Sequence, residues 1–159
     1  MKILVFSDSH RRIENIRKMA LIEKSYDRAI HLGDSEGIEN EIKSILGCPV
    51  DMVSGNCDYF SGLSDFLAVK IGKYKCILCH GHLLDARRGT EGLVYAAKEK
   101  NADYVFYGHT HIPLIKKIDD ITVVNPGSIS LPRGGFSPSY IVLNTNNDGE
   151  MTVEIKYID

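Results

Sequence analysis

The sequence lacks tryptophan, has five prolines among 159 residues and carries a net charge of only −2 at pH 7. A charge so close to zero gives no broad attraction for nucleic acid or for an anionic membrane. No apolar run approaches the length that crosses a bilayer, and the apolar start of the chain is too short for a signal peptide. We therefore expect a cytoplasmic protein that binds neither membrane nor nucleic acid.

Cysteine is also scarce, with four residues in the chain, and in the cytoplasm these are expected to be reduced. Cys76 and Cys79 have the C-x-x-C spacing of some zinc and redox sites. However, the surrounding stretch KCILCH has the pattern of a strand, in which positions three apart face opposite sides. We interpret both as buried strand residues.

What the chain does have is the composition of an ordinary globular protein, 43% hydrophobic and 25% charged. There is no repeat and no linker rich in serine, glycine or proline, so we expect a single domain over residues 1–159. The first third alternates apolar runs with helical periodicity: strands are predicted at 2–6, 28–32 and 50–54, and helices at 12–24 and 38–46. This alternation predicts a parallel sheet with right-handed crossovers.

The rest of the chain, after residue 54, contains mainly short turns between predicted strands. A helix is predicted at 90–100 and a buried strand at 103–107. The hairpins are predicted at 66–79 around Gly72-Lys73, at 113–125 around Asp119-Asp120, and at 139–157 around residues 146–149. Two packed sheets with helices outside would bury all of these strands, which indicates an α/β fold.

Polar residues collect directly after the predicted strands, where parallel sheets bind their ligands. Five of the six histidines lie in these segments, which are Ser7-Asp8-Ser9-His10, Gly33-Asp34, Gly55-Asn56-Cys57-Asp58, His80-Gly81-His82, Gly108-His109-Thr110-His111 and Asn125-Pro126-Gly127-Ser128. Imidazole and carboxylate without thiolate suit manganese, iron, cobalt, nickel or zinc. The candidates outnumber the three ligands of a single catalytic zinc, and two metals about 3.5–4 Å apart would use them all.

The order of the motifs DSH, GD, GNCD, HGH and GHTH resembles that of the calcineurin-like metallophosphoesterases, in particular their small YfcE-like group of bacterial and archaeal phosphodiesterases. The resemblance implies a four-layer α/β/β/α sandwich with two mixed β-sheets. The hairpins beyond residue 111 fit the second sheet of that family.

The same resemblance implies a dinuclear metal site that hydrolyses a small phosphodiester through a metal-bridging hydroxide. Manganese is the expected metal, with nickel, cobalt, iron or zinc as alternatives. By motif, Asp8, His10 and His111 would hold one ion, Asn56, His80 and His109 the other, and Asp34 would bridge both. Asp34 and Asn56 would thus be catalytic, and His82 would contact the substrate or donate a proton.

The sequence leaves the roles of several other residues open. Asp58 either orients a ligand or caps a backbone N–H, and His31 packs beneath the site. The arginines Arg11, Arg87 and Arg88 either contact a phosphate ester or belong to the solvated surface, and residues 125–128 are interpreted as structural support.

Cys57 departs from the larger phosphatases of the family, which have a histidine there that is thought to protonate the leaving oxygen. The identity of the general acid is therefore open. Two other functions are alternatives: a non-catalytic protein-interaction scaffold like Vps29, and a metal-dependent nuclease, although no basic groove or aromatic platform is evident. The substrate and the oligomeric state, including a homo-oligomer, are also open.

Overall fold

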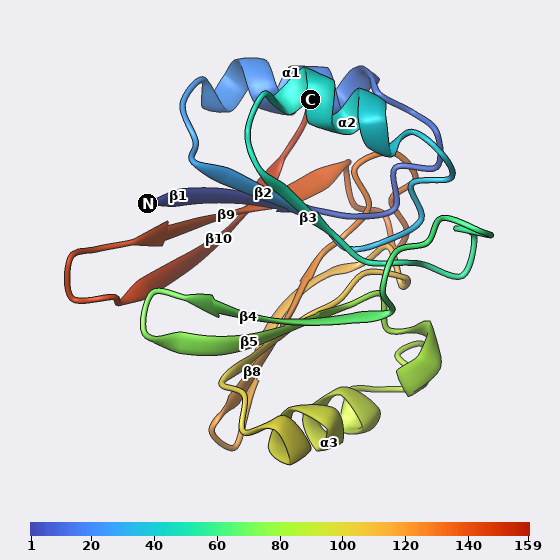
Figure 1. Ribbon diagram of the computed structural model, residues 1–159. Coiled ribbons are helices and arrows are strands. Elements are labelled where there is room, and N and C mark those ends of the chain that lie inside the picture. The colour runs from blue at the N-terminus through green and yellow to red at the C-terminus, as the bar shows by residue number, and fades with distance from the viewer.

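The computed structural model describes residues 1–159 and consists of two stacked five-stranded sheets between outer helices. Helices α1 (Glu14–Glu23) and α2 (Glu39–Leu46) cover one sheet, and α3 (Glu91–Lys100) covers the other (Figure 1). The four layers follow the order α/β/β/α, so the expected sandwich is confirmed.

The first sheet has the strand order β10-β9-β1-β2-β3. Its strands are β1 (Lys2–Phe6), β2 (Arg28–His31), β3 (Val50–Met52), β9 (Ser139–Thr145) and β10 (Met151–Tyr157). Strands β1, β2 and β3 are parallel and are linked by α1 and α2, whereas β9 runs antiparallel to both β1 and β10. The sheet is therefore mixed.

The second sheet has the order β4-β5-β6-β8-β7 and is also mixed. Its strands are β4 (Phe66–Ile71), β5 (Tyr74–Cys79), β6 (Tyr104–Phe106), β7 (Pro113–Ile118) and β8 (Ile121–Pro126). Strands β5, β6 and β8 are parallel, and the edge strands β4 and β7 join them through the two predicted two-residue turns. A short 3-10 helix, η1 (His82–Leu84), follows β5.

Three apolar clusters fill the spaces between the four layers, one between the sheets and one beneath the helices on each side. Cys76 belongs to the cluster between the sheets, whereas Cys79 belongs to the cluster under α3. Both are buried free thiols that face opposite sides of β5. The interpretation of the C-x-x-C spacing as strand packing is therefore confirmed.

The assignment of the last hairpin to the second sheet is wrong, because β9 pairs with β1 of the first sheet, with Ile3 opposite Leu143. The reason lies in the burial of β9. Ile141 and Leu143 pack between the sheets, while Tyr140 and Val142 pack toward α1 and α2. A strand that is apolar on both faces needs a place covered on both sides, and the place beside β1 provides one.

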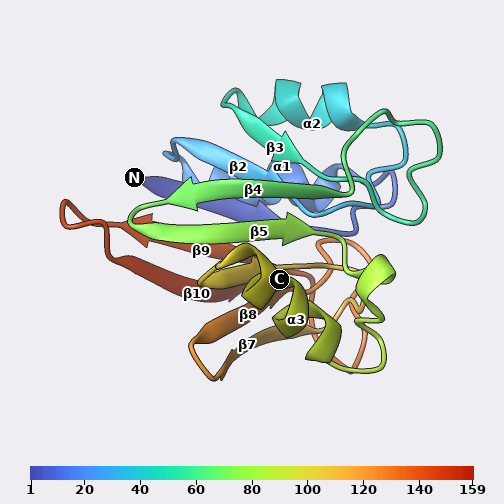
Figure 2. The same ribbon diagram turned by 60° about the horizontal axis from the view of Figure 1, so that its bottom comes forward.

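The loops after β1, β2, β3 and β5 gather at one end of the sandwich, together with the segment between β8 and β9 (Figures 1 and 2). Parallel strands bring their carboxyl ends to one edge of each sheet, and the two sheets present these edges at the same end of the molecule. No helix is both long enough and apolar enough to span a bilayer.

Candidate metal centre

The seven residues predicted to bind metal follow five different strands and meet at this common end. They are Asp8, His10, Asp34, Asn56, His80, His109 and His111. Five of them have a backbone φ between 45° and 66°: Asp8, His10, Asp34, His109 and His111. Side chains in this left-handed region are uncommon, and such residues cluster at functional sites.

Asp8, His10 and His111 form one group. His111 Nε2 lies 3.0 Å from Asp8 Oδ1 and 3.3 Å from His10 Nε2. The distance between His10 Nε2 and Asp8 Oδ1 is 3.9 Å. The three ligand atoms thus lie within 4.8 Å of one another, close enough that they could hold one ion.

A second group is centred on His80. Its Nε2 atom lies 3.2 Å from Asn56 Oδ1 and 3.3 Å from Asp34 Oδ2. The His109 ring is close, with its centroid 5.1 Å from that of His80.

Two carboxylates connect the groups. Asp34 Oδ2 lies 3.3 Å from His80 Nε2 and 3.9 Å from His10 Nε2. Asp8 Oδ1 is also 3.9 Å from His80 Nε2, so it faces the second group as well. Asp34 Oδ1 accepts a hydrogen bond from the Cys57 N–H at 2.8 Å, which leaves Oδ2 directed at the histidines.

The other ring nitrogens show which histidine atoms are free to bind a cation. His80 Nδ1 donates to the Leu32 carbonyl at 2.7 Å, and His111 Nδ1 donates to the Leu131 carbonyl at 2.6 Å. His10 Nδ1 donates to Glu36 Oε1 at 2.6 Å. Because carbonyl and carboxylate oxygens only accept hydrogen bonds, Nδ1 carries the proton in the neutral form of each ring, and Nε2 is the atom that can bind a cation.

The three Nε2 lone pairs thus converge on two carboxylates. Asp8 Oδ1 is buried there without a hydrogen-bond donor. Only a cation or an added proton can satisfy these atoms together. This donor set fits a borderline transition metal.

Burial and the neighbouring charges shift the pKa values of His80 and His109 in opposite directions. Burial disfavours the charged form of His80, but Asp34 and Asp8 outweigh it and raise the pKa of His80. For His109, burial together with His80 and Arg87 lowers the pKa to about 4. His109 is therefore neutral at pH 7 and retains a lone pair for a ligand.

Glycines let the loops approach one another closely. A β-carbon at Gly55 would collide with Asp34 Oδ1, and one at Gly108 would collide with Ser7 Oγ and lie 2.7 Å from Asp8 Oδ2. Glycine is therefore required where the GNCD and GHTH motifs pass the carboxylates.

Asp58 stabilises the loop that carries Asp34. Its Oδ2 atom accepts hydrogen bonds from the backbone N–H groups of Asp34 at 2.7 Å and Gly55 at 2.8 Å, and its Oδ1 atom accepts one from Glu36 N–H at 2.7 Å. Of the two interpretations left open, backbone capping is the one observed, and its effect is to position the Asp34 loop.

Two histidines stand apart from the ligand groups. His31 is fully buried, bonds Ser9 Oγ through Nε2 at 3.0 Å and accepts a hydrogen bond from the Gly33 N–H at 3.2 Å. It supports the loops from beneath, as expected. The His82 ring lies 5.4 Å from that of His80 and 6.1 Å from that of His109, and its buried Nδ1 has no hydrogen-bond partner.

Cys57 lies at the edge of the second group, where Asn56 Nδ2 approaches its sulfur at 3.3 Å. Burial and the neighbouring Asp34 carboxylate raise the pKa of the Cys57 thiol to about 11.

The predicted support segment 125–128 also behaves as expected. Asn125 Nδ2 donates to the Gly108 carbonyl at 2.8 Å and to Thr110 Oγ1 at 3.1 Å, and Ser128 Oγ donates to the Asp8 carbonyl at 2.8 Å. Glu36 is a side chain of the site that the sequence did not reveal. Its only signal was a carboxylate two residues after Asp34, which is too common to single out.

The three candidate arginines line two different pockets. Arg87 and Arg88 line a pocket together with Thr110, the residue between two candidate ligands. Arg11 lines another pocket, with Cys57, Tyr59 and Phe60.

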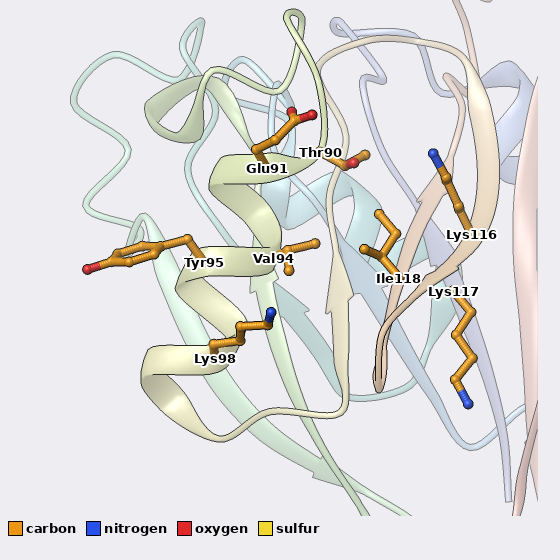
Figure 3. Close-up of a pocket in the computed structure, with 8 residues that line it drawn as sticks. All are labelled: Thr90, Glu91, Val94, Tyr95, Lys98, Lys116, Lys117 and Ile118. Atoms are coloured by element: carbon orange, nitrogen blue, oxygen red, sulfur yellow. The ribbon is translucent and has the colours of Figure 1, made fainter.

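A further pocket of about 540 Å³ lies between α3 and β7 (Figure 3). It contains none of the candidate ligands, its lysines Lys116 and Lys117 point apart, and Lys98 is paired with Asp119 at 2.8 Å. Polar groups do not converge there, so the strand-end cluster is the better candidate site.

Comparison with known proteins identifies the family of the chain. The family description "calcineurin-like phosphoesterase superfamily domain" matches residues 1–148. The chain is 36% identical over 149 residues to the probable metallophosphoesterase YsnB of Bacillus subtilis, a match that covers 93% of this chain and 86% of YsnB.

Solved structures show the same fold. An archaeal phosphodiesterase is 28% identical, with a TM-score of 0.78 over 98% of this chain and all of that one. Vps29 of Entamoeba histolytica, solved in complex with Zn²⁺, is 25% identical, with a TM-score of 0.79 over 98% of each chain. The match over nearly the whole chain and the agreement of fold lead to one conclusion: this chain belongs to the calcineurin-like phosphoesterase superfamily.

Proposed function

We propose that this metal-dependent phosphoesterase is a phosphodiesterase that uses two divalent transition-metal ions and hydrolyses small phosphodiesters. The observation that carries the proposal is the convergence of bare Nε2 atoms from three loops on the Asp8 and Asp34 carboxylates. An arrangement that leaves a buried carboxylate oxygen without a donor is costly unless a cation occupies it.

The two ions would be held by the two groups of the metal centre. Asp8, His10 and His111 would bind one, Asn56, His80 and His109 would bind the other, and Asp34 would be shared. Once bound, such a pair of ions activates a water molecule and neutralises charge on a phosphate. We favour manganese, with nickel, cobalt, iron or zinc as alternatives for the same donor set.

The reaction requires a proton as well as a nucleophile. The oxygen of water forms a bond to phosphorus, the ester oxygen departs with the electron pair of its P–O bond, and that oxygen needs a proton unless it is stable as an anion. His82 is the competing candidate, supported only by the position of its ring beside those of His80 and His109. Cys57 keeps its proton at neutral pH, but a thiol is a weak hydrogen-bond donor.

The weakness of Cys57 as a proton donor indicates which esters the enzyme should prefer. Without a strong general acid at residue 57, esters with leaving groups that are stable as anions should be cleaved best. Aryl phosphodiesters meet this requirement, and alkyl phosphomonoesters do not. We therefore favour diesters over monoesters.

The test is to strip the purified chain of metal, reload it with Mn²⁺ and follow hydrolysis of bis(4-nitrophenyl) phosphate, with elemental analysis of the same sample. Turnover with two ions per chain supports the proposal. Two bound ions without turnover of any diester would leave a metal-binding protein and contradict the enzymatic role.

A scaffold function like that of Vps29 is the main alternative, since a Vps29 is among the similar structures. All seven candidate positions hold side chains that can bind metal, and the grouping of Asp8 with His10 and His111 and with Asp34 and His80 supports the enzyme. A scaffold would bind metal and hydrolyse nothing in the Mn²⁺ assay.

A nuclease is supported by one observation that the sequence did not predict. Tyr59 and Phe60 are 81% and 105% exposed, on a loop that lines a pocket with Arg11. However, the same pocket contains Glu36, Glu39 and Asp58, whose charge repels a phosphate backbone. Single-stranded DNA in the same assay distinguishes the two activities.

We also propose a cytoplasmic location. All four cysteines are free thiols, and free thiols are typical of a reducing compartment.

A further inference from the structure

A pocket of about 500 Å³ adjoins the candidate metal centre. Three arginines lie in its lining: Arg87 and Arg88, which follow η1, and Arg133, from the segment between β8 and β9. Thr110 lies in the same lining, between the candidate ligands His109 and His111. The pocket therefore begins one residue, about 4 Å of chain, from each of them.

One further contact connects the pocket with the metal centre. The backbone N–H of Arg133 donates to the His111 carbonyl at 3.1 Å. The segment that carries Arg133 is thus bonded to the segment that carries the candidate ligand His111.

The charge in this pocket is not compensated. The three arginines are exposed, and none of their guanidinium groups makes an ion pair or a side-chain hydrogen bond within the chain; among the arginines only Arg28 does so, with Asp51. The Glu91 carboxylate lies against Gly89 in the lining, but three positive groups outnumber it. Cations held near one another repel, and an anion between them removes that cost.

The floor of the pocket is of a different character. Ala86 and Tyr107 are 7% and 3% exposed, and Ile112 and Leu114 complete an apolar surface. A solvated patch of basic residues would not need a concave apolar base. An apolar pocket with a few charged groups directed at it is the usual form of a small-molecule site.

We propose that this pocket binds a second anionic group of the substrate, so that the preferred substrates are phosphodiesters with one ester arm that ends in a phosphate or a carboxylate. The proposal rests on the phosphodiesterase function proposed above. A diester has two arms on phosphorus. The leaving arm departs from the metal centre, and the retained arm would extend past Thr110 toward the three guanidinium groups. Guanidinium is the preferred partner of both anions, because it can donate two parallel hydrogen bonds.

The experiment compares three substrates that share the 4-nitrophenolate leaving group. Their retained arms are ethyl, 2-carboxyethyl and 2-phosphonooxyethyl. In each case water adds its oxygen to phosphorus, the bond to the nitrophenyl oxygen breaks, and nitrophenolate is released. We expect kcat/KM for the better anionic arm to exceed that for the ethyl arm by about 10- to 100-fold, the effect of one or two charge-assisted hydrogen bonds. The order of the two anionic arms identifies the preferred group.

The variants test the location of the effect. Combined replacement Arg87→Gln, Arg88→Gln and Arg133→Gln should bring the ratio of anionic to ethyl substrate close to one. Arg17→Gln, the same type of replacement at an exposed position of α1 that lies outside the pocket, should leave the ratio as in the wild type. A wild-type ratio near one, or a ratio that survives the triple replacement, overturns the proposal.

Binding of the products separates this proposal from the proposed function. In calorimetry, 2-phosphonooxyethyl phosphate should bind the wild type about tenfold or more tightly than ethyl phosphate does, and the triple variant should lose this difference. If no diester is hydrolysed, the proposed function fails, and this titration still decides the pocket. Equal affinities for the two products overturn the anion site even when hydrolysis proceeds.

Discussion

The Nε2 atoms of His10 and His111 lie 3.3 Å apart, and in the neutral rings neither atom carries a proton. Two facing lone pairs at this distance repel each other. A cation held by both atoms would remove this repulsion. The chain should therefore depend on bound metal for both its activity and its stability.

Removal of metal should abolish activity. Dialysis against excess chelator should eliminate hydrolysis of bis(4-nitrophenyl) phosphate, and Mn²⁺, Co²⁺ or Ni²⁺ should restore it. Mg²⁺ should restore it poorly, because it prefers oxygen ligands and keeps its water. The metal-free chain should also have a lower Tm, since ions that bind only the folded state stabilise it. Full activity in excess chelator would refute the metal requirement.

Asp34→Asn should lower activity more than replacement of any residue that contacts one group only, such as His109→Ala. The reason is that Asp34 Oδ2 faces histidines of both groups. The amide oxygen can still accept the Cys57 N–H, so the fold should persist, as circular dichroism would show. Turnover within about tenfold of the wild type, roughly 1.4 kcal/mol of barrier, would exclude a shared role.

Glu36→Ala should weaken metal binding although Glu36 is expected to position a ligand and not to serve as one. Its carboxylate accepts the Nδ1 proton of His10 and thereby directs Nε2 at the site. Loss of such a partner typically costs about 10- to 100-fold in metal affinity. Calorimetric titration with Mn²⁺ measures the metal affinity. Glu41→Ala, at an exposed position of α2, is the matched control and should bind as the wild type does.

The dependence of rate on leaving-group pKa should be steep in the wild type if residue 57 supplies no effective acid. Cys57→Ala should then change the slope little, and Cys57→His should flatten it if the imidazole reaches the ester oxygen. A positioned general acid is worth about 10²–10⁴ in rate. A series of aryl and alkyl diesters measures the slope.

His82 is the competing donor in the same series. If it protonates the leaving oxygen, the wild-type slope is shallow, and His82→Ala makes it steep without loss of metal. A shallow slope that becomes steep only in Cys57→Ala would instead identify the thiol as the acid and contradict the prediction that residue 57 is an ineffective donor.

Glu23 should make the stability of the fold depend on pH. Its buried carboxylate pairs with Lys2 at 2.5 Å and with Lys156 at 3.0 Å, and it accepts a hydrogen bond from Tyr140 at 2.7 Å. Burial alone would raise the pKa of Glu23, but Lys2, Tyr140 and Lys156 lower it to about 2 in the folded chain, from an ordinary value of 4.5. The unfolded chain therefore takes up the proton first. The stabilisation is complete above pH 4.5 and is lost as the pH falls toward 2.

Urea denaturation between pH 3 and pH 7 checks this. The difference in free energy of unfolding between wild type and Glu23→Gln should be largest above pH 5 and should shrink in acid. Glu14→Gln, at an exposed position of the same helix, should show no such trend. A difference independent of pH would mean that Glu23 acts through its shape and not through its charge.

Much of the fold followed from local pattern. The runs at 2–6 and 66–71 became strands with those bounds, and the two-residue turns at Gly72-Lys73 and Asp119-Asp120 formed as predicted. Helix ends differed by one or two residues, as at 14–23 against the predicted 12–24. Local sequence determines these features because backbone preference and side-chain periodicity act over a few residues.

The local sequence could not predict the sheet to which β9 belongs. Its pattern reports only that both faces are apolar, and several positions in the two sheets would bury such a strand. Pairing with β1 joins residues more than 130 positions apart, for example Ile3 with Leu143, and is decided by the packing of the whole chain.

For the site, the sequence by itself determined the ligand types and their places at strand ends, because motif chemistry and strand periodicity are both local. Only the tertiary structure decided which atoms face one another. It showed that Asp8 faces both groups, that Asp58 positions the Asp34 loop, that Glu36 orients His10, and that three arginines from two distant segments share a pocket. These relationships depend on distances between loops of different strands, and such distances exist only after the two sheets have packed together.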